Sequence, residues 1–325
     1  MSGARMAVDL GPHELVRAAL IARRFYVDGA TKVQIADELG LSRFKVARVL
    51  ADARAAGLVH VDIRLPASID AELSAALCTS VGLSRAVVID TPYQPDASLR
   101  AQLAGVTADL LTEVVQDDDV LGLSWSRTID LATTRLSRLA RCSVVQLAGT
   151  LARTDTDNST VEIVRRAATV GGGRAWPIYA PLVVEDASAA ESLRRQPDIA
   201  AAFAQFDRLT KAVVAVGSWE SGYSTVWDAL PTDQREAYAR VGVRAEVSAR
   251  LLDAHGADVV TDLDDRVMAI STAQLRTVPE VIAIVGGPAR VVAAEAAVRS
   301  GLVSTLVTDA SVAKHLLAAG ARPRR

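Results

Sequence analysis

The chain has 325 residues, a formal net charge of −2, and 50% hydrophobic but only 4% aromatic residues. Its length favours about two domains, each with its own core, and it has no apolar run long enough to predict a membrane span. The first residues lack the apolar stretch of a secretory signal, so we expect a cytoplasmic protein with two buried, reduced thiols, Cys78 and Cys142. The four histidines have no metal-ligand spacing, and we expect neither a metal nor a cofactor.

Residues 12–55 read as three helices. Helical periodicity predicts the first one, with an inner face made of Leu15, Ala19, Ala22 and Tyr26. Thr31 and Gln34 have the spacing of a capping box at the start of a second helix. Gly40 permits the left-handed backbone of a turn, and Ser42 caps a third helix, whose apolar face carries Val46, Val49, Leu50 and Ala53.

The third helix carries its basic residues away from that apolar face. A helix-turn-helix places the start of its second helix in the major groove of DNA. In that position Arg48 can pair with guanine, Lys45 can reach a base or a phosphate, and Phe44 can touch a thymine methyl group. Ser42 and Arg43 suit phosphate contacts.

The competing interpretation is a helical hairpin whose charged side chains are merely solvated. Three observations favour double-stranded DNA as the partner. Residues 1–65 hold 10 Lys or Arg against 7 Asp or Glu, Phe44 stands among basic residues, and residues 57–65 alternate apolar and polar as a wing strand does. We therefore predict a winged helix-turn-helix domain over residues 1–65.

The pattern changes after Pro66 to repeated strand and helix segments. Apolar runs predict strands at residues 86–90, 119–124, 143–149, 175–180, 211–218, 266–270, 281–287 and 304–309. Helical segments rich in Ala and Leu lie between many of them, at residues 97–116, 128–140, 158–168 and 288–300. Strands without alternation are covered on both faces, so residues 66–325 are predicted to form a Rossmann-like, mostly parallel α/β domain with its ligand at the carboxyl ends of the strands.

Three of these strand ends are rich in Gly, Ser or Thr, and two of them carry Arg. Backbone N–H groups and hydroxyls at a strand-to-helix turn suit an anion. The candidate ligand-binding residues are Ser124, Trp125, Ser126, Arg127, Thr128, Gly149, Thr150, Gly286, Gly287 and Arg290. Trp125 is either a core residue or a platform for a sugar ring. Asp117, Asp118 and Asp119 precede a strand and are expected in a solvated turn.

Several stretches of the sequence, taken from both parts of the chain, agree in order and spacing with those of a known protein family. They read QIADELGLSRFKVARVLADARAAGLVHVDI in the N-terminal part, and DDDVLGLSWSRT, VVQLAGT, YAPLVV, ISTAQLRTVPEVIAIVGGPAR and GLVSTLVTDASVAKHLL in the C-terminal part. From about residue 14 to about residue 318 the chain resembles the SorC/DeoR-type family of sugar-responsive transcriptional regulators.

The resemblance implies an effector domain related to sugar-phosphate isomerases and coenzyme A transferases. It also implies tetramers, built as dimers of dimers, whose affinity for an operator changes when a small sugar, polyol or phosphosugar binds. By position, the family's acidic effector contact falls on Glu246 and its basic contact on Arg290. Ser126 and Ala245 stand where glycine is usual, and Glu246 is one methylene longer than the usual Asp, so we expect a pocket of altered size.

Three functions are compatible with these patterns. The first is a transcriptional regulator, not an enzyme, that controls a carbohydrate catabolic operon in response to the effector. The alternative is a sugar-phosphate isomerase-like enzyme with an accessory DNA-binding hairpin, in which Glu246 acts as the base. The candidate loops hold no histidine or lysine to serve as its partner, which favours the regulator over the enzyme. A DNA-binding scaffold without a ligand is a further alternative.

Overall fold

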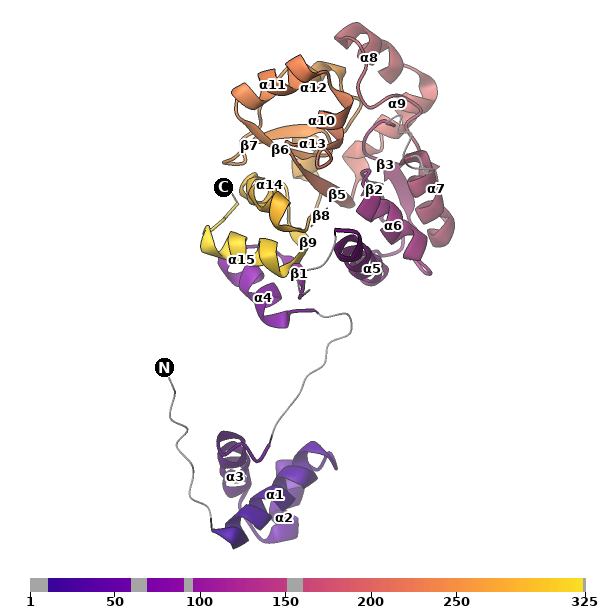
Figure 1. Ribbon diagram of the computed structural model, residues 1–325. Coiled ribbons are helices and arrows are strands. Elements are labelled where there is room, and N and C mark those ends of the chain that lie inside the picture. The colour runs from indigo at the N-terminus through magenta and orange to yellow at the C-terminus, as the bar shows by residue number, and fades with distance from the viewer. Residues whose placement is uncertain (1–10, 60–68, 91–95, 151–159, 324–325) are drawn as a thin grey trace. The chain divides into compact units, whose positions relative to one another are not determined.

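The computed structural model describes residues 11–59, 69–90, 96–150 and 160–323 (Figure 1). The contacts within the chain divide it into two compact units, Met1–Leu65 and Pro66–Arg325. Most of the expected wing strand, residues 60–65, lies outside the described residues.

The first unit holds three helices, α1 (Pro12–Tyr26), α2 (Lys32–Leu39) and α3 (Arg43–Ala55). The capping box is confirmed: Thr31 Oγ accepts the Gln34 N–H, and the Gln34 side chain accepts the Thr31 N–H at 2.8 Å. Gly40 has φ 61° and ends α2 in the left-handed conformation. The helices enclose a small aliphatic core of Ile21, Ala22, Ile35, Ala36, Val46 and Leu50.

The predicted inner face of α1 is wrong except at Ala22. The structure buries Ala18, Ile21 and Ala22, whereas Leu15 and Tyr26 are 36% and 38% exposed and Ala19 is exposed. Both sets fit a helical period, and they share Ala22. The buried set contains Ile21, which is fully buried in the core that α1 shares with α2 and α3. Packing between the helices therefore determines which of the two sets is buried.

The second unit is built on a parallel sheet. Its strands are β1 (Arg85–Ile89), β2 (Val120–Leu123), β3 (Ser143–Gln146), β4 (Ala175–Trp176), β5 (Lys211–Ser218), β8 (Glu280–Ile284) and β9 (Thr305–Asp309). They lie in the order β1-β9-β8-β5-β2-β3-β4, and every neighbouring pair is parallel. The prediction of a mostly parallel α/β sheet is thus confirmed.

Helices cover both faces of this sheet (Figure 1). Helices α5 (Asp96–Val114), α6 (Arg127–Arg135) and α7 (Thr160–Gly171) pack on one face. The other face is covered by α4 (Ala71–Ala76), α8 (Ala187–Arg194), α9 (Pro197–Phe203), α13 (Thr272–Thr277), α14 (Val291–Arg299) and α15 (Ala310–Ala318). This double cover explains why all four residues of β2 are buried and why its sequence is apolar without alternation.

Two predicted strands differ from the structure. Residues 266–270 form no sheet strand; Val267 and Ala269 make only isolated bridges to Val183 and Ala148. The strand expected over residues 175–180 is limited to Ala175–Trp176, because Pro177 has no N–H to continue the ladder.

An antiparallel hairpin was missed. It comprises β6 (Val243–Val247) and β7 (Arg250–Asp253), and β6 pairs with the end of β5. Helices α10 (Thr225–Ala229), α11 (Thr232–Arg240) and α12 (Leu263–Arg266) belong to the same lobe, which has its own small core. The hairpin turn is Ser248-Ala249, and nothing in that pair resembles the Asn-Gly signal of a two-residue turn.

The expectation of a solvated turn is wrong for Asp119. Its carboxylate lies 2.9 Å from Lys211 Nζ and accepts the Thr210 hydroxyl at 2.6 Å, and the Asp119 and Lys211 side chains are only 11% and 13% exposed. Asp117 and Asp118 are exposed, as expected. Asp119 thus ties the start of β2 to the start of β5.

The strand order places a crevice at the carboxyl ends of β2 and β5. From β2 the chain proceeds to β3 and β4 on one side, and from β5 it proceeds to β8 and β9 on the other. Ligands of open α/β sheets bind where the order reverses in this way. Among the described residues, no helix is both long enough and apolar enough to cross a membrane.

Candidate functional site

The start of α3 forms an exposed basic surface. Ser42, Arg43, Phe44, Lys45 and Arg48 are all exposed, and Phe44 is 86% exposed. On the opposite face Val46, Leu50 and Ala53 are buried, which confirms the predicted apolar face. The Ser42 hydroxyl accepts the Lys45 N–H at 3.2 Å, so it caps the first turn of the helix.

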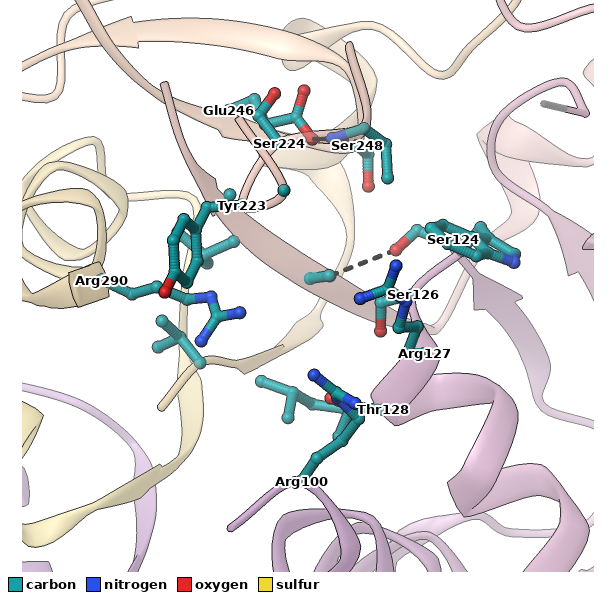
Figure 2. A pocket seen from close by; sticks show the side chains of 18 of the residues that line it. Arg100, Ser124, Ser126, Arg127, Thr128, Tyr223, Ser224, Glu246, Ser248 and Arg290 are labelled. Carbon is teal, nitrogen blue, oxygen red and sulfur yellow. Dashed lines mark hydrogen bonds between the residues drawn. The ribbon is translucent and has the colours of Figure 1, made fainter. Parts of the chain in front are cut away.

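A cavity of about 120 Å³ lies in the second unit at the predicted crevice (Figure 2). Its wall comes from the ends of β2, β3, β5 and β8, from the start of α5 and from the β6–β7 hairpin. Nine of the predicted site residues line this cavity. Eight come from the strand-end loops, namely Ser124, Trp125, Ser126, Arg127, Thr128, Gly149, Gly286 and Arg290, and the ninth is Glu246. Loops far apart in the sequence thus converge on one small space.

The hydroxyl-rich loop after β2 is held by internal hydrogen bonds. Ser124 is buried, and its Oγ accepts the Ala215 N–H of β5 at 3.2 Å (Figure 2). Ser126 Oγ accepts the Ile129 N–H at 3.0 Å and caps α6. Trp125 is half-buried, packs against the apolar layer under α5 and α6, and also lines the cavity. The loop is therefore preorganised at the N-terminus of α6, where the helix dipole favours an anion.

Arg290 is held from two sides. Its Nη1 donates to the Gly286 carbonyl at 2.8 Å, and its guanidinium group lies 4.6 Å from the centre of the Tyr223 ring (Figure 2). Burial lowers the pKa of Arg290, and the nearby charges of Arg100 and Arg127 lower it further, while Asp96 opposes them. Three guanidinium groups therefore face a common space and repel one another.

Glu246 is buried on the hairpin side of the cavity. Its carboxylate accepts the Thr225 N–H and hydroxyl at 3.2 and 3.0 Å and the Val226 N–H at 3.2 Å. Burial raises the pKa of Glu246, although these donors oppose the shift. Glu246 thus fixes the first turn of α10 to β6, which is a positioning role as well as a place in the wall.

Two predicted site residues, Thr150 and Gly287, do not line the cavity. Thr150 pairs through its backbone with Ala180 and Leu182 beside it. Gly287 has φ 92° and donates its N–H to Asp309 at 2.9 Å, so it is the residue at which the chain turns from β8 into α14. Gly149 does line the cavity, but a Cβ there would lie 2.5 Å from the Pro181 carbonyl oxygen, so the backbone approach itself requires glycine.

Several wall residues were not predicted. They come from the start of α5, from the loop between β5 and α10, from α10 itself and from the hairpin turn: Asp96, Arg100, Tyr223, Ser224, Thr225, Asp228 and Ser248. A signal existed for one group, because SGYST follows the strand ending at Ser218 and is as rich in hydroxyls as the loop after β2. No pattern marked the hairpin turn. No group of three His, Cys, Asp or Glu arranged to hold a metal occurs among the described residues.

The family model described as "Putative sugar-binding domain" matches residues 66–318. The chain is 30% identical over 305 residues to the "Uncharacterized transcriptional regulator YjhU" of Escherichia coli K12, covering 90% of this chain and 92% of that protein. It is 23% identical to the deoxyribonucleoside regulator of Bacillus subtilis, covering 91% and 95% of the two chains.

A solved structure supports the fold. The full-length sorbitol operon regulator SorC of Klebsiella pneumoniae matches with a TM-score of 0.73 at 21% identity, covering 93% of this chain and 98% of that one. The match therefore extends over both units of this chain and not over the sheet alone.

Proposed function

Because the chain belongs to the SorC/DeoR-type family of sugar-binding transcriptional regulators, we propose that it binds an operator through a winged helix-turn-helix and releases or tightens it when a small effector binds. The start of α3 is the DNA-reading surface. Arg48 and Lys45 read bases, Phe44 contacts a thymine methyl group, and Arg43 and the capped N-terminus at Ser42 contact phosphates.

The effector is a sugar or polyol derivative with an anionic group. The observation that carries this is the convergence of Arg100, Arg127 and Arg290 on one cavity whose wall also holds the hydroxyls of Ser124 and Thr128. Burial is the main cause of the lowered pKa of Arg290, and the charges of Arg100 and Arg127 add to it; an anion placed among the three guanidinium groups offsets both effects. The hydroxyls and backbone N–H groups then hold the sugar hydroxyls.

The enzyme alternative is weaker. Proton transfer between adjacent carbons needs a positioned base and a partner group. Among the described residues, those that line the cavity include no histidine and no lysine, and the carboxylate of Glu246 is already engaged by Thr225 and Val226. The names of the relatives also describe regulators. As the family resemblance implies, the form that binds the operator is a homo-oligomer.

The test is a fluorescence-anisotropy titration of the full chain on duplex DNA from the region upstream of its own gene. Sorbitol, D-gluconate, D-fructose 6-phosphate, D-glucose 6-phosphate and D-ribose 5-phosphate are then added in turn. We expect one of the anionic compounds to change the DNA affinity by at least about fivefold. No preference for this duplex over a scrambled one of equal length would contradict the proposal.

A further inference from the structure

The turn of the β6–β7 hairpin is unusual in both of its residues. Ser248 and Ala249 have φ 48° and φ 66°, a left-handed conformation that glycine and asparagine adopt far more readily. A residue with a side chain is strained in this conformation. Both side chains are buried, so the surrounding packing holds the turn in this conformation.

The Ser248 hydroxyl is also unusual. Ser248 is 7% exposed, and its Oγ has no hydrogen-bond partner among the described residues. A buried hydroxyl in that situation is costly, and most buried side-chain polar atoms have a partner. Strain and an unpaired polar group therefore coincide at a single residue, and strained residues cluster at active sites and ligand-binding sites.

Ser248 lies in the wall of the cavity, beside Ser224 and Glu246 and across from the arginine side chains (Figure 2). Serine has one side-chain torsion with three staggered positions. A change of rotamer can therefore redirect its hydroxyl while the backbone stays in place. The hairpin side of the wall then offers a neutral hydrogen-bonding group to the part of the ligand that is remote from the guanidinium groups.

We propose that the Ser248 hydroxyl hydrogen-bonds to a hydroxyl of the bound sugar and thereby determines which hydroxylated ligand the cavity accepts. This inference rests on the proposed function, because it requires that a sugar derivative occupies the cavity. The hairpin turn thereby takes part in ligand recognition. The arginines hold the anionic end of the ligand, and Ser248 recognises a hydroxyl at its opposite end.

The experiment compares Ser248→Ala with Thr308→Val in the full chain. Thr308 is the matched control, because its Oγ is also buried without a partner among the described residues, yet it does not line the cavity. Isothermal titration calorimetry uses whichever of sorbitol, D-gluconate, D-fructose 6-phosphate, D-glucose 6-phosphate and D-ribose 5-phosphate binds the wild type most tightly. We expect Ser248→Ala to weaken binding on the order of tenfold, and Thr308→Val to leave it unchanged.

Ser248→Gly serves as the second variant, since glycine favours the left-handed turn and also removes the hydroxyl. We expect it to fold with an equal or higher melting temperature and to bind the ligand as weakly as Ser248→Ala. If both Ser248 variants bind like the wild type, the recognition role of Ser248 is overturned and the proposed function stands. If none of the five compounds binds the wild type, the proposed function fails, and this inference fails with it.

Discussion

Arg48 and Arg23 are comparable residues of the first unit, because both are exposed arginines on helices and differ mainly in the helix that carries them. Arg48 is 78% exposed and lies 3.9 Å from Asp52, a surface pair that contributes little to stability. We predict that Arg48→Ala weakens operator binding by about 1–3 kcal/mol and relaxes the preference for one base pair.

The Arg23→Ala variant is the control for that prediction. Because it removes the same charge from α1, its effect measures the general electrostatic contribution alone. Anisotropy titrations at matched salt should separate the two variants. Equal affinities for Arg48→Ala and the wild type would show that α3 does not read the operator.

The two cysteines are expected to differ in reactivity. Burial, together with the nearby charge of Asp119, raises the pKa of Cys142 from 9.0 to about 11. At pH 8 only on the order of one thiol in a thousand is then the reactive thiolate. We predict that Cys142 in Cys78→Ser protein reacts with Ellman's reagent only after denaturation, whereas wild type also reacts through the half-buried Cys78.

The same pKa shift has a consequence for stability. The folded state binds more protons than the unfolded state between about pH 9 and pH 11, so the free energy of unfolding falls as the pH rises through this window.

Fast labelling of native Cys78→Ser protein at pH 8 would contradict the assigned burial of Cys142.

At the scale of the elements, the ion pair between Asp119 and Lys211 joins the starts of β2 and β5, at the ends of these strands that are remote from the cavity. Removing one partner of a buried pair leaves the other charge uncompensated. We predict that Asp119→Asn lowers the free energy of unfolding by about 3 kcal/mol in urea denaturation. Asp117→Asn, at an exposed position two residues earlier, should change it by less than about 0.5 kcal/mol.

The pH dependence of that difference follows from the pKa of Asp119. Burial acts to raise it, but hydrogen bonds from Gln116, Thr210 and Lys211 together lower it below its usual 3.8. The contribution of Asp119 is therefore complete above this usual value and is lost as the pH falls through the lower, folded-state value. The gap between wild type and Asp119→Asn should be constant near neutral pH and should close only in acid.

At the scale of the whole molecule, regulation requires coupling between two sites on different units of the chain. Such coupling is reciprocal: if the effector changes operator affinity by some factor, the operator changes effector affinity by the same factor. We predict equal factors in calorimetry of the effector with and without saturating operator. Arg290→Gln should abolish the effector response while it leaves operator affinity without effector unchanged.

Unequal factors would show that the effector and the operator are not linked by a simple two-state equilibrium. A loss of operator binding in Arg290→Gln would show instead that Arg290 supports the folded state and not recognition of the ligand. The melting temperature of Arg290→Gln distinguishes these two roles, because only a role in the folded state lowers it.

Local patterns in the chain were enough to predict the three N-terminal helices, the caps at Thr31 and Ser42, the parallel sheet and most of the cavity loops. Hydrogen bonds of a cap and the periodicity of a buried face act over a few residues, so they are visible in order along the chain. Strand-end loops could be placed together because parallel strands end at one edge of their sheet.

Three-dimensional packing alone selected the other features. Two sets of residues on α1 fit a helical period, and contact with α2 and α3 determined which of them is buried. The Asp119–Lys211 pair joins two distant strands, and Arg100 and Tyr223 reach the cavity from elements with no ligand-binding motif. The left-handed turn at Ser248 and Ala249 contradicts local preference, because contacts made by the whole lobe outweigh about 1–2 kcal/mol of strain per residue.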